Sequence, residues 1–164
     1  MFKLEYRIVL SDDDDFEGQN GFLQIKCNDY KYGEMYPKEL ETVMDKVSLF
    51  DWFERLIKVV KYLMTEDYVV LSDVESYNIW IEFQKSSEEV MISVVKAKKE
   101  LGTQDIEFIL GEPVEREWTV SQISYNQLKM EVVNKASEYI AYVVANNKSS
   151  SIDKIKEELE EILL

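Results

Sequence analysis

The chain has 164 residues and a formal net charge of −14, because 33 acidic side chains outnumber 19 basic ones and histidine is absent. With 46% apolar and 12% aromatic residues it can bury a sizeable core, which argues against wholesale disorder, and its length favours one domain over residues 1–164. A surface this acidic repels phosphate, so we expect no direct binding of nucleic acid.

Several residue types and segments that carry common chemistry are missing. Without histidine the chain lacks the most frequent general base and metal ligand, and Cys27 alone can form neither an internal disulfide nor a four-ligand zinc site. The first residues have no apolar core like that of a signal peptide, and nowhere do 18 consecutive apolar residues occur. We therefore expect a cytoplasmic protein with no disulfide, membrane span, metal or cofactor.

The first half of the chain predicts two or three strands followed by a helix. Residues 2–10 alternate apolar and charged side chains, as a half-buried strand does. A second strand, around 23–27, follows an acidic loop, and residues 30–32 are able to return as a short third strand. From Ser48 to Met64 apolar side chains recur every three or four residues, which predicts an amphipathic helix capped by its first residue. The alternative is that this helix begins earlier, near Lys38.

The second half predicts four strands, one ambiguous segment and two helices. The strands are 68–74, 77–83, 90–96 and 114–120, the ambiguous segment is 105–110, and the helices are 121–146 and 150–164, the last more loosely attached. Strands that cluster, rather than alternate with helices, indicate an antiparallel sheet. The order β-β-(β)-α-β-β-β-β-α-α therefore predicts an α+β fold, with one antiparallel sheet, helices packed on one face and the other face partly solvated.

The acidic loop begins like a calcium-binding loop. Its tip holds Asp12, Asp13, Asp14 and Asp15. Acids at 13, 15 and 17 and a glycine at 18 match positions 1, 3, 5 and 6 of that motif, but the twelfth position, which needs a bidentate glutamate, is Gln24. We interpret the segment as a solvated hairpin loop whose charges deter edge pairing. The alternative interpretations of this loop are a weak cation site and a contact with a partner.

Two predicted strands carry polar faces suited to a partner. Trp80 and Glu82 share one such face, and Glu115 and Glu117 share the other, because strand side chains repeat every two residues. If both strands lie in one sheet, with apolar faces toward the helices, these four residues form an open acidic face around an aromatic anchor. The alternatives are that Trp80 is covered by the protein's own chain and that the two glutamates are ordinary surface acids.

Two stretches resemble a known group of proteins. The segment from Val47 to Leu56, VSLFDWFERL, follows an N-terminal hairpin and precedes the segment from Glu75 to Phe83, ESYNIWIEF. In element order and local sequence, residues 2–120 resemble small acidic bacterial immunity proteins of polymorphic, wall-associated toxin systems. The resemblance implies a cytoplasmic α+β protein that binds one toxin domain and neutralises it. It supplies no shared motif that could be placed on single residues.

The net charge favours the same kind of function. Many toxin domains are nucleases, whose sites need positive potential to hold phosphate, and an acidic protein reaches such a site faster through electrostatic steering. We expect a non-enzymatic protein that binds a basic partner, most specifically an immunity or inhibitor protein. A small-ligand-binding or regulatory domain is the alternative, and a divalent-ion-dependent hydrolase that uses carboxylates is the third possibility.

Overall fold

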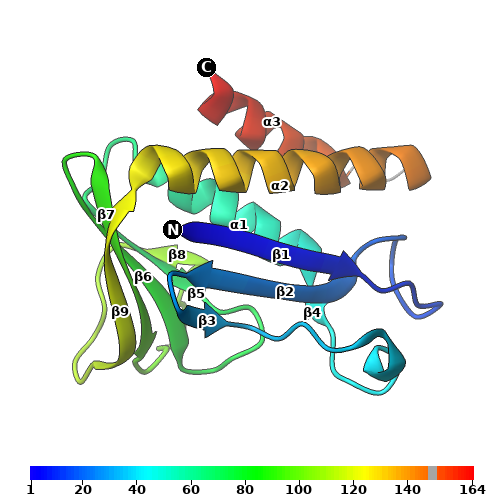
Figure 1. Cartoon of the computed structure of the whole chain (residues 1–164), viewed down its shortest axis with the longest axis horizontal. Helices are drawn as coiled ribbons and strands as arrows, with labels where there is room; N and C mark the ends of the chain where they lie inside the picture. The colour runs from blue at the N-terminus through cyan, green and yellow to red at the C-terminus, as the bar shows by residue number, and fades with distance from the viewer. Residues whose placement is uncertain (148–150) are drawn as a thin grey trace.

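The structure is a computed structural model that describes residues 1–147 and 151–164. Over these residues the chain forms two antiparallel sheets and three α-helices, which confirms the predicted α+β class (Figure 1). The prediction of one sheet is wrong, because the N-terminal strands pair among themselves and with a short later strand instead of joining the strands that follow the first helix.

Sheet A contains β1 (Phe2–Ile8), β2 (Asn20–Cys27) and β3 (Tyr30–Tyr32), and the short β4 (Val47–Ser48) pairs with the start of β2. β1 pairs with β2 over its whole length. The other edge of β1 lies along α2 (Tyr125–Asn146), where the Leu4 amide donates to Glu131 Oε1 at 2.8 Å. The helix therefore takes up hydrogen-bonding capacity that an edge strand would otherwise expose.

Sheet B has the strand order β8 (Ile106–Glu107), β5 (Tyr68–Ser72), β6 (Ile79–Ser86), β7 (Glu89–Lys96) and β9 (Glu115–Ser124). The ambiguous segment 105–110 supplies the two-residue β8. Two register shifts interrupt the pairing of β7 with β9, one between Val90 and Ile92 and one between Val94 and Val95. Such bulges change which face a side chain points to, and the second shift decides the position of the candidate residues on β9.

The helices begin at capping residues. In α1 (Leu49–Tyr62) the Ser48 side chain accepts a hydrogen bond from the Asp51 amide, and residues 38–40 form a separate 3₁₀ turn, not an earlier start of the helix. α2 begins at Tyr125, later than predicted, because residues 121–124 complete β9. α3 spans Ser151–Leu163, and residue 150, where the predicted helix starts, lies outside the described residues.

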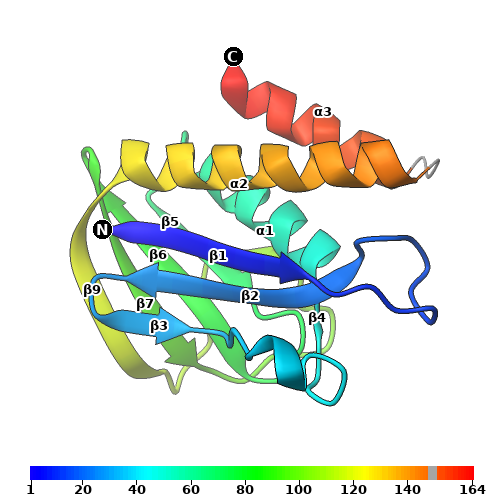
Figure 2. The same ribbon diagram turned by 45° about the vertical axis from the view of Figure 1, so that its right-hand side comes forward.

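A cluster of buried apolar side chains connects both sheets with all three helices, and α1 lies at its centre (Figures 1 and 2). Phe53 of α1 stacks on Tyr139 of α2 with ring centroids 4.8 Å apart and meets Tyr6 of β1 edge-on at 5.1 Å. α3 packs against α1 and α2 through its apolar stripe, which consists of Ile152, Ile155, Leu159 and Ile162.

Candidate functional site

Trp80 is buried beneath the protein's own chain. Its side chain is 3% exposed and lies on the opposite face of sheet B from the main core. Its indole Nε1 donates to the carbonyl oxygen of Ala97 at 3.1 Å. The surrounding apolar cluster contains Val70, Val95 and Ala97, with Leu110 and Val114 packed against it. The prediction of an exposed aromatic anchor at Trp80 is wrong, because the chain between β7 and β9 covers this part of the sheet.

Glu82 is also buried, and its charge is paired within sheet B. The side chain is 0% exposed, Arg116 donates to it from Nε and Nη2 at 2.9 and 2.8 Å, and the Tyr68 hydroxyl donates at 2.7 Å. Burial acts to raise the pKa of Glu82, but these hydrogen bonds outweigh it and hold the pKa below its usual range. A carboxylate engaged in this way cannot bind a partner, so the assignment of Glu82 to an open interface is wrong.

The bulge in β9 explains why Arg116 reaches Glu82. Trp118 pairs with Val94, and Arg116 pairs with Val95. Glu117, between them on β9, therefore has no paired residue on β7. The shift turns Arg116 to the face of sheet B that carries Trp80 and Glu82, and it turns Glu115 to the opposite face. Glu117, at the bulge, binds Lys96 Nζ at 2.9 Å. Glu115 and Glu117 are exposed, but they do not share a face with Trp80 and Glu82 as the alternation predicted.

The acidic loop between β1 and β2 is held in place by hydrogen bonds. Asn147, at the end of α2, donates to the Glu17 carbonyl at 2.6 Å and accepts from the Glu17 amide at 2.8 Å. Asp14 is half-buried and accepts from Asn20 Nδ2 at 2.7 Å. Asp12, Asp13 and Asp15 are exposed. Together with the exposed Glu17, the loop therefore presents four carboxylates to solvent from an anchored backbone.

Calcium binding is not expected at this loop. Among residues 1–147 and 151–164, no group of three or more His, Cys, Asp or Glu side chains is placed to hold a metal ion. Gln24, at the twelfth position of the motif, lies in β2 and donates to the Gly33 carbonyl instead. Calorimetric titration should give no calcium dissociation constant tighter than about 1 mM, because the bidentate ligand is missing. A micromolar constant that Asp13→Asn abolishes would contradict this expectation.

The two groups of exposed candidate acids lie at opposite ends of the molecule. In both views the loop that joins β1 to β2 projects at one end, and β9 forms the other (Figures 1 and 2). The structure therefore does not bring Asp12, Asp13 and Asp15 together with Glu115 and Glu117 in one small interface.

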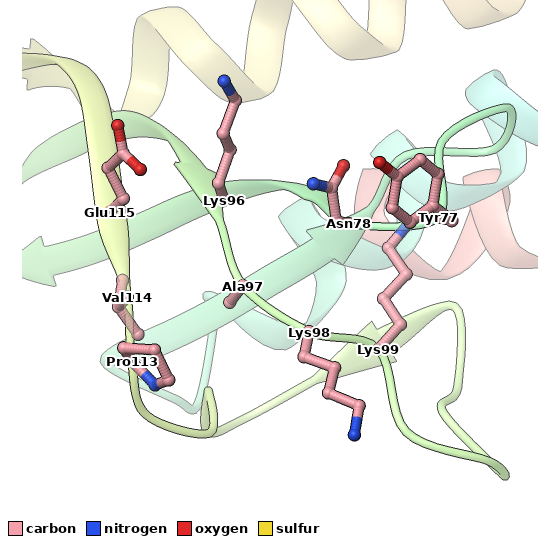
Figure 3. Close-up of a pocket in the computed structure, with 9 residues that line it drawn as sticks. All are labelled: Tyr77, Asn78, Lys96, Ala97, Lys98, Lys99, Pro113, Val114 and Glu115. Carbon is pink, nitrogen blue, oxygen red and sulfur yellow. The ribbon is translucent and has the colours of Figure 1, made fainter.

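A groove of about 680 Å³ opens where β7 and β9 separate (Figure 3). Tyr77 and Asn78 line one side, and the segment 113–115 lines the other. Its floor is the extended segment 96–99, which contains Ala97 above the indole of Trp80. The pairing of β7 with β9 ends at Lys96 and Glu115, beyond which the two chains diverge and leave this space.

Lys99 fixes the floor of the groove. Its ammonium group donates to the carbonyl oxygens of Asp73 and Ser76 at 2.9 and 2.6 Å and lies 5.4 Å from the ring centre of Trp80. Burial lowers the pKa of Lys99. The lysine thus joins the chain after β7 to the loop between β5 and β6. The sequence alone does not indicate the groove, although the run from Lys96 to Lys99, KAKK, contains three basic residues in an acidic chain.

A second cleft, of about 530 Å³, lies between β3 and the loop that follows β5. Desolvation raises the pKa of Glu75 in this cleft, which is a feature that the hydrolase alternative requires. Both carboxylate oxygens are occupied, however: the Ser48 amide and Trp52 Nε1 each donate at 2.9 Å. The neighbouring Asp73 accepts from the Tyr32 hydroxyl and from two backbone amides. These carboxylates fasten the loop to α1 and sheet A.

Acidic and basic side chains are distributed differently between surface and interior. Most acidic residues are exposed, whereas most of the described basic residues are only partly exposed. Arg55 illustrates the pattern, since it donates to the Ser72 carbonyl at 2.5 Å and pairs with Asp105 at 3.1 Å. Lys85 likewise donates to the Leu63 carbonyl at 2.9 Å. Basic side chains are thus engaged within the fold more often than acidic ones, and acidic side chains predominate at the surface.

No family model, curated protein or solved structure matches this chain. The resemblance to immunity proteins therefore stays a hypothesis. Within the part of the chain that the structure describes, no helix has the length and apolarity needed to cross a membrane. The charge distribution, the anchored acidic loop and the groove are the features from which a function can be argued.

Proposed function

We propose that this chain binds a positively charged protein domain and neutralises it, most specifically as an immunity or inhibitor protein of a basic, nuclease-type toxin domain in the cytoplasm. The observation that supports this proposal is the outward placement of acidic side chains together with the inward use of basic ones. Exposed acidic side chains therefore outnumber exposed basic ones, in keeping with the net charge. Such a surface attracts a basic partner and speeds its association.

The anchored loop of Asp12, Asp13 and Asp15 is the proposed first contact. Its backbone is already ordered by Asn147, so binding loses less conformational entropy than it would with a mobile loop. An exposed apolar side chain accompanies the acids, because Leu10 directly precedes the loop and lines a hollow together with Asp12 and Asp14. Protein interfaces typically combine apolar contacts at the centre with polar and charged residues at the rim. The role proposed for the chain is binding, not catalysis.

Co-expression tests this function. The probe is the C-terminal domain of the protein encoded beside this chain's gene, produced in bacteria alone and together with the chain. We expect the domain to arrest growth alone, and co-expression to restore growth and to yield a one-to-one complex by light scattering. Failure of a toxic domain to bind, or a neighbouring gene that encodes no secreted toxin, would contradict the proposal.

A further inference from the structure

The groove shown in Figure 3 has the size and rigidity of a ligand site. Its volume of about 680 Å³ lies within the range of roughly 300–1,000 Å³ that is usual for small-molecule pockets. Its floor is held by the Trp80–Ala97 hydrogen bond, by the Lys99 contacts and by a backbone hydrogen bond from Ala97 to Asn78 at 3.0 Å. A ligand would therefore meet a surface that is already formed.

Lysines predominate among the charged side chains around this groove, although the carboxylate of Glu115 also lines it. Lys96 and Lys98 extend in opposite directions from the floor (Figure 3). Lys96 is paired with Glu117 at 2.9 Å, whereas the Lys98 side chain is 78% exposed and has Glu100 at 3.5 Å on an equally open surface. An exposed pair of this kind contributes little energy, so Lys98 remains available to an anion.

An exposed aromatic ring forms one wall. Tyr77 is 84% exposed, although a tyrosine ring gains free energy from contact with another flat or apolar surface. Opposite it stand the Pro113 ring and Val114, with the methyl group of Ala97 between the two walls. Asn78 directs its amide nitrogen toward the groove in the same view, and its Oδ1 accepts from Ser76 Oγ at 3.3 Å. The walls suit a planar apolar group, and the polar atoms at the rim donate hydrogen bonds.

We propose that this groove binds a small planar aromatic anion, with its ring between Tyr77 and the Pro113–Val114 wall and its carboxylate or phosphate on Lys98. The lysines of the groove are opposite in charge to the acidic surface, so Lys98 attracts the anion at short range even though Glu115 lies on the same groove. Moderate salt screens the distant acids but not a direct contact of about 3 Å. Affinity for the anion should therefore fall less with salt than the affinity of the acidic surface for a basic protein.

Titration followed by amide NMR spectra tests the proposal with two matched probes, indole-3-acetate and the neutral indole-3-acetamide. We expect the acetate to shift the amide signals of Tyr77, Asn78, Ala97, Lys98 and Val114, with a dissociation constant of about 1 mM or tighter. The acetamide should bind at least about fivefold more weakly, because it lacks the charge-assisted hydrogen bond.

Variants separate the two halves of the site. Lys98→Gln should weaken acetate binding about fivefold and leave acetamide binding unchanged, whereas Tyr77→Ala should weaken both. Lys38→Gln, an exposed lysine in another part of the chain, is the matched control and should change neither. Equal binding of the two probes, shifts away from the groove, or no shifts at about 1 mM would overturn the proposal. These outcomes do not depend on the acidic surface, so they are distinct from failure of the proposed immunity function.

Discussion

Leu56→Asp should leave the chain unfolded at room temperature. Leu56 is 0% exposed in α1, within the cluster that joins both sheets and the helices. The substitution removes apolar packing and places a charge among apolar side chains, where neither water nor a basic group can compensate it. The expected loss in the free energy of unfolding is more than about 4 kcal/mol. Thermal unfolding followed by circular dichroism is the measurement.

The matched control for Leu56→Asp is Glu54→Asp, which introduces the same residue on the half-buried side of α1. Glu54 pairs with Lys58 at 3.2 Å, and the shorter side chain weakens a contact worth only a few tenths of a kcal/mol. The control should melt close to the wild type. If Leu56→Asp also melted within about two degrees of the wild type, the position assigned to α1 at the centre of the core would be wrong.

Arg116→Met is expected to cost about 3 kcal/mol of stability at neutral pH. The substitution leaves the Glu82 carboxylate buried without its bidentate cation, and a buried charge that has lost its partner is strongly destabilising. Tyr68 still donates one hydrogen bond, and Arg116 is itself half exposed, so water entering the site reduces the loss. Urea unfolding at pH 7 gives the magnitude.

The pH dependence identifies the cause of this loss. In the wild type the pKa of Glu82 is lowered, so its stabilising contribution is present above the ordinary glutamate pKa and is lost as pH falls through the folded value. Without Arg116 burial raises that pKa, so the penalty is largest at neutral pH and shrinks as pH falls through the raised value. The double variant Glu82→Leu/Arg116→Met should recover most of the stability. A deficit that is the same at pH 7 and pH 4, or no recovery in the double variant, would contradict the account.

Local patterns predicted the elements whose neighbours in sequence decide their structure. The helix from Ser48 was found because its apolar spacing and its cap are both contained in one short segment. The strands β6 and β7 were found for the same reason. The division into two sheets was not predictable in this way, because strand pairing depends on residues far apart in the chain. The end of β9 was missed since residues 121–124 continue the strand where helix periodicity had been expected.

The errors at the candidate site have two physical origins. Alternation correctly places Trp80 and Glu82 on the face away from the core, but it cannot show that the segment between β7 and β9 covers that face. The bulge that turns Arg116 outward inserts one residue and reverses the alternation, so sequence assigns Glu115 to the wrong face. The acidic loop, by contrast, could be recognised from sequence because a run of exposed charge needs no tertiary partner.

The rate of association measured against salt tests the proposed function most directly. The complex that we propose, between this chain and a toxin domain encoded beside its gene, should form more slowly as salt rises, by about tenfold or more between low and high salt, with a nearly constant dissociation rate. Neutralising Asp12, Asp13 and Asp15 to asparagine should slow association and flatten the dependence. Neutralising the exposed Glu66, Glu88 and Glu89 to glutamine changes the net charge equally but outside the acidic loop, and should have a much smaller effect. Equal effects of the two triple variants, or association independent of salt, would contradict binding of a basic partner through the acidic loop.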